Sequence, residues 1–312
     1  MNYLCNMKYY FAPVQGHTDA AYRHFHALRY GCEDVIYTTP FIRLEKGEIR
    51  KKDLKDVCSN LNEGQSVVPQ VIFRDRSELE TLVDILKAEG VSRIDINMGC
   101  PFPLQTSHGR GAATVANEAC RRAVTDIVTA NPDLVFSVKM RLGYKEEEWK
   151  ELLQDLNTIP LDHIAVHPRT AKDQYSGQLS MDSFEAIYRE SKNPVVYNGD
   201  IRTPEDAIKI AEQYPRLAGI MIGRGALGRP SIFKEIMAGN EIDAAERLRQ
   251  LKNFHRDLIT HYTESLIGGE HQVLSKIQPF WEYAEDEIGR KAWKAIKKAS
   301  TMAKYQTALA LI

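Results

Sequence analysis

The feature that most constrains the fold is a repeat of short apolar runs, most of them separated by longer stretches with amphipathic helical spacing. The runs are rich in β-branched residues and apolar at nearly every position, which is typical of strands buried on both faces of a parallel sheet. Eight such runs cover residues 9–14, 35–41, 67–73, 93–98, 135–142, 163–169, 194–200 and 219–224. This alternation of strand and helix predicts an α/β fold, a (β/α)8 TIM barrel.

Helical spacing between the strands is clearest at residues 77–89, 112–130 and 203–213. The last segment begins with Thr203 and Pro204, the order expected of an N-cap and a first helical residue. A doubly wound open sheet is the alternative to a barrel. That fold more often carries a G-x-G-x-x-G turn after its first strand, and the sequence has none there.

The pattern changes after residue 239. Residues 242–266 and 273–311 have helical spacing and no strand-like runs, and Gly268-Gly269 marks a break between helices. We therefore expect a catalytic barrel over residues 1–239 and a small helical domain over residues 240–312.

Composition excludes several classes of protein. The chain has 41 Lys+Arg and 42 Asp+Glu, so bulk charge does not indicate a nucleic-acid binder, and any such surface must come from local clustering. Five cysteines without a C-x-x-C pair argue against a disulfide framework and a structural zinc site. No stretch resembles a signal peptide or a membrane span. We expect a cytoplasmic monomer without metal.

Polar residues gather where the predicted strands end. The carboxyl ends of barrel strands meet on one face, where the active site forms, so seven polar ends out of eight predict a catalytic centre. These residues are Gln15, Gln70, Asn97 with Cys100, Lys139 with Arg141, His167 with Arg169, Asn198 with Asp200, and Arg224.

Glycines follow the last two strands, at Gly199 and Gly223. Backbone N–H groups approach a phosphate closely only where no Cβ intervenes, and loops after strands seven and eight commonly bind phosphate. Arg224 could add a charge-assisted bond. A second glycine-rich loop, 108–113, fits a phosphate loop or a flexible lid equally well.

Cys100 and Lys139 are the candidates for chemistry. A free thiol has a pKa of about 8.5 and donates a proton at neutral pH without tuning. We expect the other four cysteines, Cys5, Cys32, Cys58 and Cys120, to be buried small side chains. Lys139 could form a Schiff base or bind an anionic cofactor atom, and Arg141 points the same way because side chains alternate along a strand.

Taken in order, these residues resemble the tRNA-dihydrouridine synthases, flavoenzymes that reduce uridine in tRNA. The resemblance covers about residues 11–228, and the helical tail matches more loosely. It rests on Ala12-Pro13-Val14-Gln15-Gly16-His17-Thr18-Asp19, Gln70, Asn97-Met98-Gly99-Cys100-Pro101, Gly111-Ala112, Lys139-Met140-Arg141, His167-Pro168-Arg169-Thr170, Gln174-Tyr175-Ser176-Gly177, Asn198-Gly199-Asp200-Ile201 and Gly223-Arg224-Gly225-Ala226.

The resemblance implies FMN bound at the strand ends and reduced by NADPH. Hydride would pass from the flavin to C6 of uracil, and Cys100 would protonate C5. Asn97, Arg141 and Arg169 would contact the substrate. The implied cofactor residues are Pro13, Val14 and Gln15 beside the ring, Gln70, Lys139 and His167 at its polar edge, and Asn198, Gly199, Asp200, Gly223 and Arg224 around the phosphate or ribityl chain.

This sequence departs from the family at a few positions in the flavin pocket. Val14-Gln15 stands where Met and a small or acidic residue are frequent, His17 replaces a common apolar residue, and Phe73 stands where a small residue is often found. These departures concern the detail of the pocket and the subfamily.

Local basic clusters supply a candidate RNA surface. Arg290, Lys294 and Lys298 recur every four residues and so share one helical face. A second cluster follows the second strand, between Arg43 and Lys55. With the family likeness, tRNA backbone contact is favoured over a merely solvated face.

Three other functions compete with this one. An FMN barrel oxidoreductase acting on a small-molecule enone or pyrimidine would ignore RNA. A catalytically silent tRNA-binding protein would bind RNA without flavin. A Lys139 Schiff-base lyase would be colourless.

Overall fold

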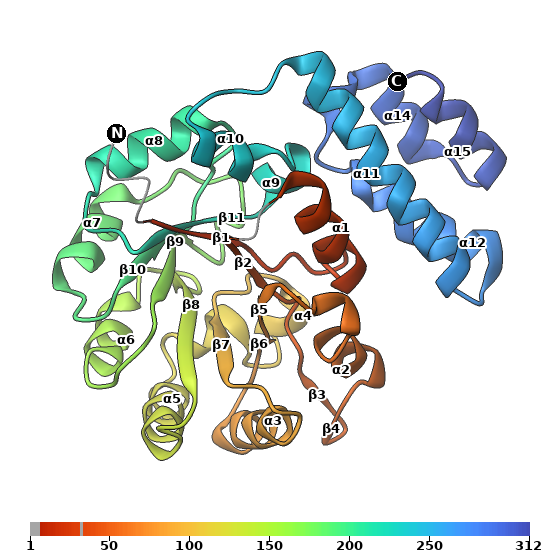
Figure 1. The fold of residues 1–312 in the computed structure, drawn as a ribbon. Coiled ribbons are helices and arrows are strands. Elements are labelled where there is room, and N and C mark those ends of the chain that lie inside the picture. Colours follow the sequence, from red (N-terminus) through yellow and green to blue (C-terminus); the bar gives the residue numbers. More distant parts are fainter. Residues whose placement is uncertain (1–6, 32–33) are drawn as a thin grey trace.

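The structure is a computed structural model that describes residues 7–31 and 34–312. Its centre is a parallel sheet with the strand order β5-β2-β1-β11-β10-β9-β8-β7-β6 (Figure 1). The strands are β1 (Lys8–Phe11), β2 (Val35–Thr38), β5 (Ser66–Val68), β6 (Gln70–Val71), β7 (Arg93–Met98), β8 (Val135–Gly143), β9 (Ile164–Thr170), β10 (Val195–Tyr197) and β11 (Gly219–Ile222).

The sheet closes on itself because its two ends, β5 and β6, are consecutive pieces of chain separated only by Pro69. Proline has no N–H to donate to a ladder, and the predicted third strand is divided at this residue. β5 pairs with β2 and β6 with β7. All eight predicted strands are therefore present, and the predicted (β/α)8 barrel is confirmed.

Helices surround the barrel (Figure 1). The longer ones are α1 (Ala20–Tyr30), α3 (Arg76–Ala88), α5 (Glu118–Ala130), α6 (Trp149–Leu156), α7 (Met181–Glu190), α8 (Pro204–Gln213) and α10 (Ile232–Ala238). Shorter helical elements are α2 (Lys51–Val57), η1 (Asn60–Asn62), α4 (Pro103–Thr106), η2 (Gly111–Thr114) and α9 (Arg224–Gly228).

Two local expectations have different outcomes. Thr203 caps α8 as predicted, and its side chain and that of Asp206 form a reciprocal capping box. The helix predicted over residues 112–130 begins only at Glu118, the first residue of α5, because the Asn117 side chain accepts the Cys120 N–H as an N-cap. A hairpin of β3 (Leu44–Glu45) and β4 (Glu48–Ile49) follows β2 and was not predicted.

Side-chain alternation along the strands positions the site. On β8, Val138 and Met140 belong to the apolar core shared with the helices. Lys139 and Arg141 therefore point into the barrel. Register then aligns neighbouring strands, because Lys139 is opposite Asn97 on β7 and Arg141 is opposite His167 on β9.

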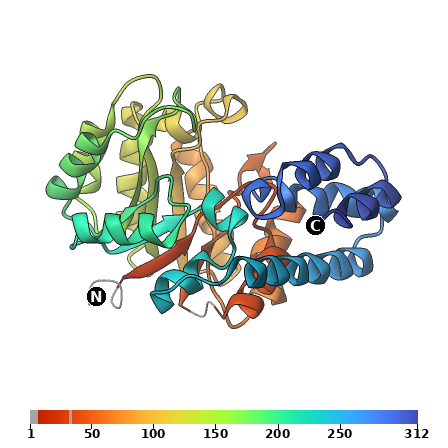
Figure 2. The ribbon, with the colours of Figure 1, turned by 90° about the horizontal axis from the view of Figure 1, so that it is seen from above.

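Beyond α10 the chain is helical, as predicted. Its elements are α11 (Ala244–Ser265), α12 (Gly269–Ile277), η3 (Gln278–Trp281), α13 (Glu285–Ile288), α14 (Arg290–Lys298) and α15 (Met302–Leu309), which we call the tail. The tail lies at one side of the barrel beside α1 and α9 (Figures 1 and 2). Phe254 of α11 packs edge-on against Tyr22 of α1, with ring centroids 4.9 Å apart.

The described residues include no helix long and apolar enough to cross a bilayer, and no group of three or more potential metal ligands. Cys120 is buried as predicted, whereas Cys58 is exposed. The prediction for Cys58 was wrong because α2 belongs to a surface excursion after β2 and has no buried residues. Cys5 and Cys32 lie outside the described residues.

Candidate active site

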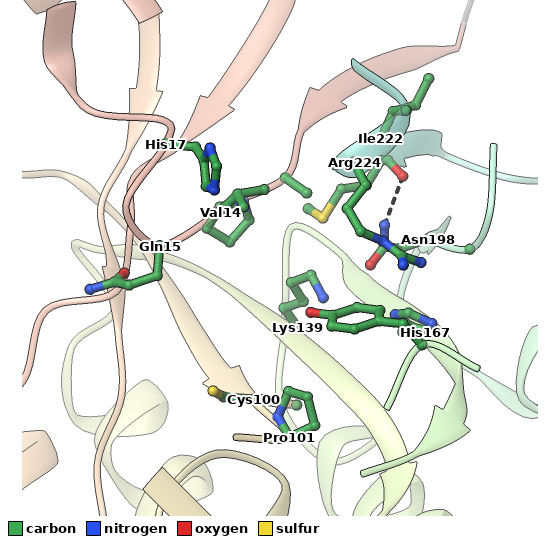
Figure 3. Close-up of a pocket in the computed structure, with 18 of the residues that line it drawn as sticks. Val14, Gln15, His17, Cys100, Pro101, Lys139, His167, Asn198, Ile222 and Arg224 are labelled. Carbon is green, nitrogen blue, oxygen red and sulfur yellow. Dashed lines mark hydrogen bonds between the residues drawn. The ribbon is translucent and has the colours of Figure 1, made fainter. Parts of the chain in front are cut away.

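A cavity of about 370 Å³ opens at the carboxyl ends of the barrel strands (Figure 3). Every residue predicted to hold the cofactor lines it, together with Cys100, Asn97 and Arg141. In Figure 3, Cys100 lies at one side, Asn198 and Arg224 at the other, and Lys139 between them. The structure therefore brings together residues spread from Pro13 to Arg224.

Asn97 holds the turn that carries the thiol. Its Oδ1 accepts the N–H groups of Gly99 at 3.0 Å and Cys100 at 2.9 Å. Its Nδ2 donates to Gln70 Oε1 at 2.7 Å. Asn97 is only 6% exposed. Its polar atoms are thus engaged in shaping the turn that carries Cys100.

The network continues into the barrel. Gln70 Nε2 donates to Asp95 Oδ2 at 2.7 Å, and Ser137 Oγ donates to Asp95 Oδ1 at 2.6 Å. Asp95 is 1% exposed. A buried carboxylate needs such partners, and here they fix the amide of Gln70. Sequence analysis missed Asp95 and Ser137, although both occupy inward positions of predicted strands.

The environment of Cys100 keeps its thiol protonated. The side chain is buried with Phe41 and Ile72. This burial raises the pKa of the Cys100 thiol, although Lys139 and Arg141 work in the opposite direction. A protonated thiol suits an acid rather than a nucleophile.

The glycine-rich loop 108–113 supports Cys100 from behind. Ala112 N–H donates to the Cys100 carbonyl at 3.1 Å. Gly111 has a φ of +61°, and a Cβ there would lie 2.7 Å from the Cys100 carbonyl oxygen. Arg110 is buried and pairs with Glu78 at 2.6 Å. The close approach therefore explains Gly111 without any ligand.

Lys139 presents a cation to the cavity. Burial, with Arg141 close by, lowers the pKa of its ammonium to about 8. Within the described ranges, no hydrogen bond or ion pair reaches its Nζ. Such a group is available to an anionic or electron-rich ligand.

Two arginines predicted to touch substrate are engaged with the protein. Arg141 is 1% exposed and donates to the carbonyls of Thr170 at 2.8 Å and Gln174 at 2.7 Å. Arg169 forms a two-pronged pair with Asp200 and does not line the cavity. Arg141 thus shapes the loop after β9, and Arg169 fixes Asp200.

At the far end of the cavity, ion pairs and a hydrogen bond connect residues of neighbouring strands. Asp200 has a φ of +38° and also accepts from Arg224 at 3.0 Å. Burial opposes ionisation there, yet Arg169 and Arg224 hold the pKa of Asp200 below its ordinary value. Asn198 Nδ2 donates to the Met221 carbonyl at 2.8 Å, which ties β10 to β11.

His167 and Tyr175 face this cationic end. Burial and the neighbouring cations, Arg141 first, lower the pKa of His167 well below its usual range. The imidazole is therefore neutral at physiological pH. The guanidinium carbons of Arg224 and Arg141 lie 4.0 Å and 5.1 Å from the Tyr175 ring centroid. Tyr175 occurs in a motif that sequence analysis quoted without assigning it a role.

The tail also contributes to the cavity, which sequence analysis missed. Glu282 and Tyr283 line it beside His17. His17 Nε2 lies 3.1 Å from Glu282 Oε2, and the His17 and Tyr283 ring centroids are 5.5 Å apart. Burial lowers the pKa of His17 even though Glu282 favours the cation. Only the unusual His17 gave a signal in the sequence.

The structure does not bring Arg290, Lys294 or Lys298 into the cavity. They lie on the exposed face of α14, whose buried face carries Ala292 and Ile296. The second basic cluster is partly neutralised, because Arg43 pairs with Glu45 and Arg50 with Asp53.

Comparison with known proteins places this geometry in a family. A family model described as "Dihydrouridine synthase (Dus)" matches residues 10–310. The tRNA-dihydrouridine synthase B of Shewanella oneidensis is 31% identical over 245 residues, covering 77% of this chain and 75% of that protein. The protein of the same name from Pseudomonas aeruginosa is 32% identical over 229 residues, covering 72% and 67%.

A probable tRNA-dihydrouridine synthase of Treponema pallidum is 28% identical over 300 residues, covering 91% of this chain and 86% of that protein. Among solved structures, the old yellow enzyme from Trypanosoma cruzi has a TM-score of 0.53 at 8% identity and covers 76% of this chain and 89% of its own. That likeness shows the barrel fold alone. The family model spans nearly the whole chain, and the chain belongs to the dihydrouridine synthase family.

Proposed function

We propose that this protein reduces the C5–C6 double bond of specific uridines in tRNA, with FMN as resident cofactor and NADPH as reductant. One observation carries the proposal: the buried thiol of Cys100, whose pKa is raised by burial, shares a cavity with the Lys139 ammonium, which has no hydrogen bond or ion pair within the described residues. Family membership supports it. Both the acid and a site for an electron-rich ring are then present at the barrel mouth.

The residues present fit FMN. Lys139 supplies a cation that has no hydrogen bond or ion pair among the described residues. His167 is on the adjacent strand β9, and Gln70 lines the same cavity from β6. Pro13, Val14 and Gln15 would lie beside the isoalloxazine. Bound FMN would supply hydride to C6 of uracil. The ribityl-phosphate end would be held by Asn198, Gly199, Asp200, Gly223 and Arg224, which line one end of the cavity.

Cys100 would deliver the proton to C5. Its thiol is nearly closed to solvent, with 7% of the residue exposed, and burial favours the protonated form. Asn97 would act by positioning the turn that carries the thiol. Arg141 would act on the substrate indirectly, by holding the loop after β9. Arg169 would act by fixing Asp200.

We also propose a division of labour along the chain. Residues 1–239 would hold the cofactor and perform the reaction, and residues 240–312 would bind tRNA through Arg290, Lys294 and Lys298. The target base must leave its stack to reach Cys100. A tRNA substrate places the reaction in the cell interior, where thiols stay reduced. We propose that a monomer suffices.

The deciding experiment incubates the FMN-loaded protein with NADPH and unmodified tRNA, then maps nuclease fragments by mass spectrometry. We expect a gain of two hydrogens at a defined uridine. Reducible flavin without any gain, on both unmodified tRNA and tRNA from a strain lacking this protein, would contradict the proposal and favour a small-molecule reductase. Replacing NADPH by NADH in the same assay tests the reductant.

A further inference from the structure

A second hollow, of about 480 Å³, opens beside the catalytic cavity. It lies between the loops that follow β7, β8 and β9, and Pro101 lines both spaces. On the opposite wall, Gln174 lines the hollow and the next residue, Tyr175, lines the cavity. The two spaces are therefore neighbours. Along the loop after β7, two residues, Pro101 and Phe102, separate Cys100 from Pro103, which also lines the hollow.

The described residues that form the wall of this hollow include two lysines and no acidic residue. The lysines, Lys145 and Lys172, are exposed. Neither ammonium has an ion pair or hydrogen bond within the described part of the chain. The Lys172 N–H donates to the Tyr144 carbonyl at 3.0 Å, which holds the two loops together.

Two nearby carboxylates are turned to other partners. Asp173 accepts the Thr170 N–H at 3.0 Å and its hydroxyl at 2.7 Å. Glu148 accepts the Tyr144 N–H at 3.0 Å. Glu146, next to Lys145, is exposed and has no side-chain partner among the described residues, so what the hollow offers an anion such as a phosphodiester is two ammonium groups on tied loops rather than a net charge.

Two large apolar side chains are exposed on the loop after β7, next in the chain to the prolines that line the hollow, and Phe102 also lines the main cavity. Phe102 is 51% exposed and Leu104 is 67% exposed, and both follow Cys100 closely in the chain. Phe102 precedes α4, and its carbonyl accepts the Gln105 N–H at 2.8 Å, so the backbone that presents it is fixed. An exposed aromatic ring on a loop that shares a hollow with two lysines offers both stacking and charge, the combination that binds single-stranded nucleic acid.

We propose that Phe102, Leu104, Lys145 and Lys172, which we call the distal rim, bind the nucleotides that flank the target uridine in tRNA. The two lysines hold the phosphodiester, and Phe102 stacks on an adjacent base. This inference rests on the proposed function. A base that leaves its stack to reach Cys100 disrupts its neighbours, and the distal rim is next to the point of entry.

The position of the distal rim relative to the tail supports this role. The tail packs against α1 and α9, which follow β1 and β11. The distal rim follows β7, β8 and β9, which lie across the closed barrel from β1 and β11. RNA held on both sides would place its target over the cavity between them.

The test compares Lys145→Glu/Lys172→Glu with the matched control Lys192→Glu/Lys209→Glu, which changes exposed lysines elsewhere on the barrel by the same charge. We measure tRNA binding by fluorescence anisotropy against salt, and KM for tRNA and NADPH. Loss of two phosphate contacts on a single strand should reduce the slope of log K against log salt by about 1.4. We expect KM for tRNA to rise roughly tenfold or more, with FMN content and NADPH oxidation unchanged.

Phe102→Ala should lower kcat/KM for tRNA roughly five- to hundredfold, the range for losing one stacked base. Lys145→Gln/Lys172→Gln keeps the test valid if the glutamate pair folds poorly. It removes the same two phosphate contacts, so the slope should fall by the same amount. The proposal is overturned if the distal-rim variants bind tRNA as the control does, or if KM rises for NADPH alone. A wild-type protein that forms no dihydrouridine would instead contradict the proposed function.

Discussion

The barrel mouth and the tail carry the polar groups that we propose act on the same substrate, yet the two regions hold these groups in opposite ways. At the mouth, Asn97 and Arg141 are 6% and 1% exposed, and each makes several hydrogen bonds within the protein. On the tail, Lys294 and Lys298 are exposed and have no partner among the described residues. The difference shows that chemistry requires fixed geometry, whereas attraction of a polyanion requires only charge.

A short series of contacts links the basic helix α14 to the barrel mouth. Trp293 of α14 donates through Nε1 to the Glu282 carbonyl at 3.2 Å, and the Glu282 side chain meets His17 at the cavity wall. The basic helix therefore contacts a residue that lines the cavity. The tail completes the cavity as well as carrying charge.

The largest effect should come from Cys100→Ala at the mouth. A positioned general acid contributes roughly 10²–10⁴-fold, and we expect a loss of dihydrouridine formation of that order. FMN content and flavin reduction by NADPH should be retained. Cys120→Ala, which removes another buried thiol, is the control. Full turnover in Cys100→Ala would remove Cys100 as the acid.

The next effect concerns Lys139 and is a function of pH. Its folded pKa of about 8 lies below the ordinary value of 10.5. The ammonium is therefore charged below pH 8 and loses its proton as pH rises above it. FMN binding to the apoprotein should weaken up to about tenfold per pH unit above 8. Lys139→Met should bind FMN more weakly than the wild type at pH 7, and its FMN affinity should no longer fall as pH rises through 8. Titration of flavin fluorescence measures both.

Sequence alone predicted much of the fold because its signals are local. Apolar periodicity located all eight barrel strands, and the strand-end rule gathered residues such as Lys139 and Asn198 at one cavity. The start of α5 was missed because helical spacing continued through the 3₁₀ turn before Asn117.

What sequence could not predict are partners fixed by tertiary structure. Arg169 on β9 pairs with Asp200, which follows β10. Glu282 of the tail contacts His17 although more than two hundred residues separate them in the sequence. Neither pair follows any periodic pattern. The roles of Asn97 and Arg141 also depend on which backbone groups the loops bring within reach.

A smaller effect should follow charge reversal on the tail. Lys294→Glu/Lys298→Glu should weaken the salt dependence of tRNA binding, because two phosphate contacts are lost. The slope of log K against log salt should fall by about 1.4 to 1.8. The rate at saturating tRNA should stay near that of the wild type. Stopped assays over a range of tRNA concentrations, at two salt concentrations, separate the effect on tRNA binding from the effect on the rate at saturation. A fall in kcat with unchanged binding would break the contrast drawn between mouth and tail.

The smallest effect should come from Asp257→Asn at the junction of barrel and tail. Asp257 pairs with Arg29 at the surface, and the Arg29 side chain is 35% exposed. Exposed pairs contribute about 0–1 kcal/mol, since water and salt screen them. Phe254, by contrast, is fully buried in the same junction, and Phe254→Ala should cost about 3–5 kcal/mol. Urea unfolding of both variants compares them directly. A loss from Asp257→Asn as large as that from Phe254→Ala would mean that a charge pair, rather than apolar packing, holds the tail against the barrel.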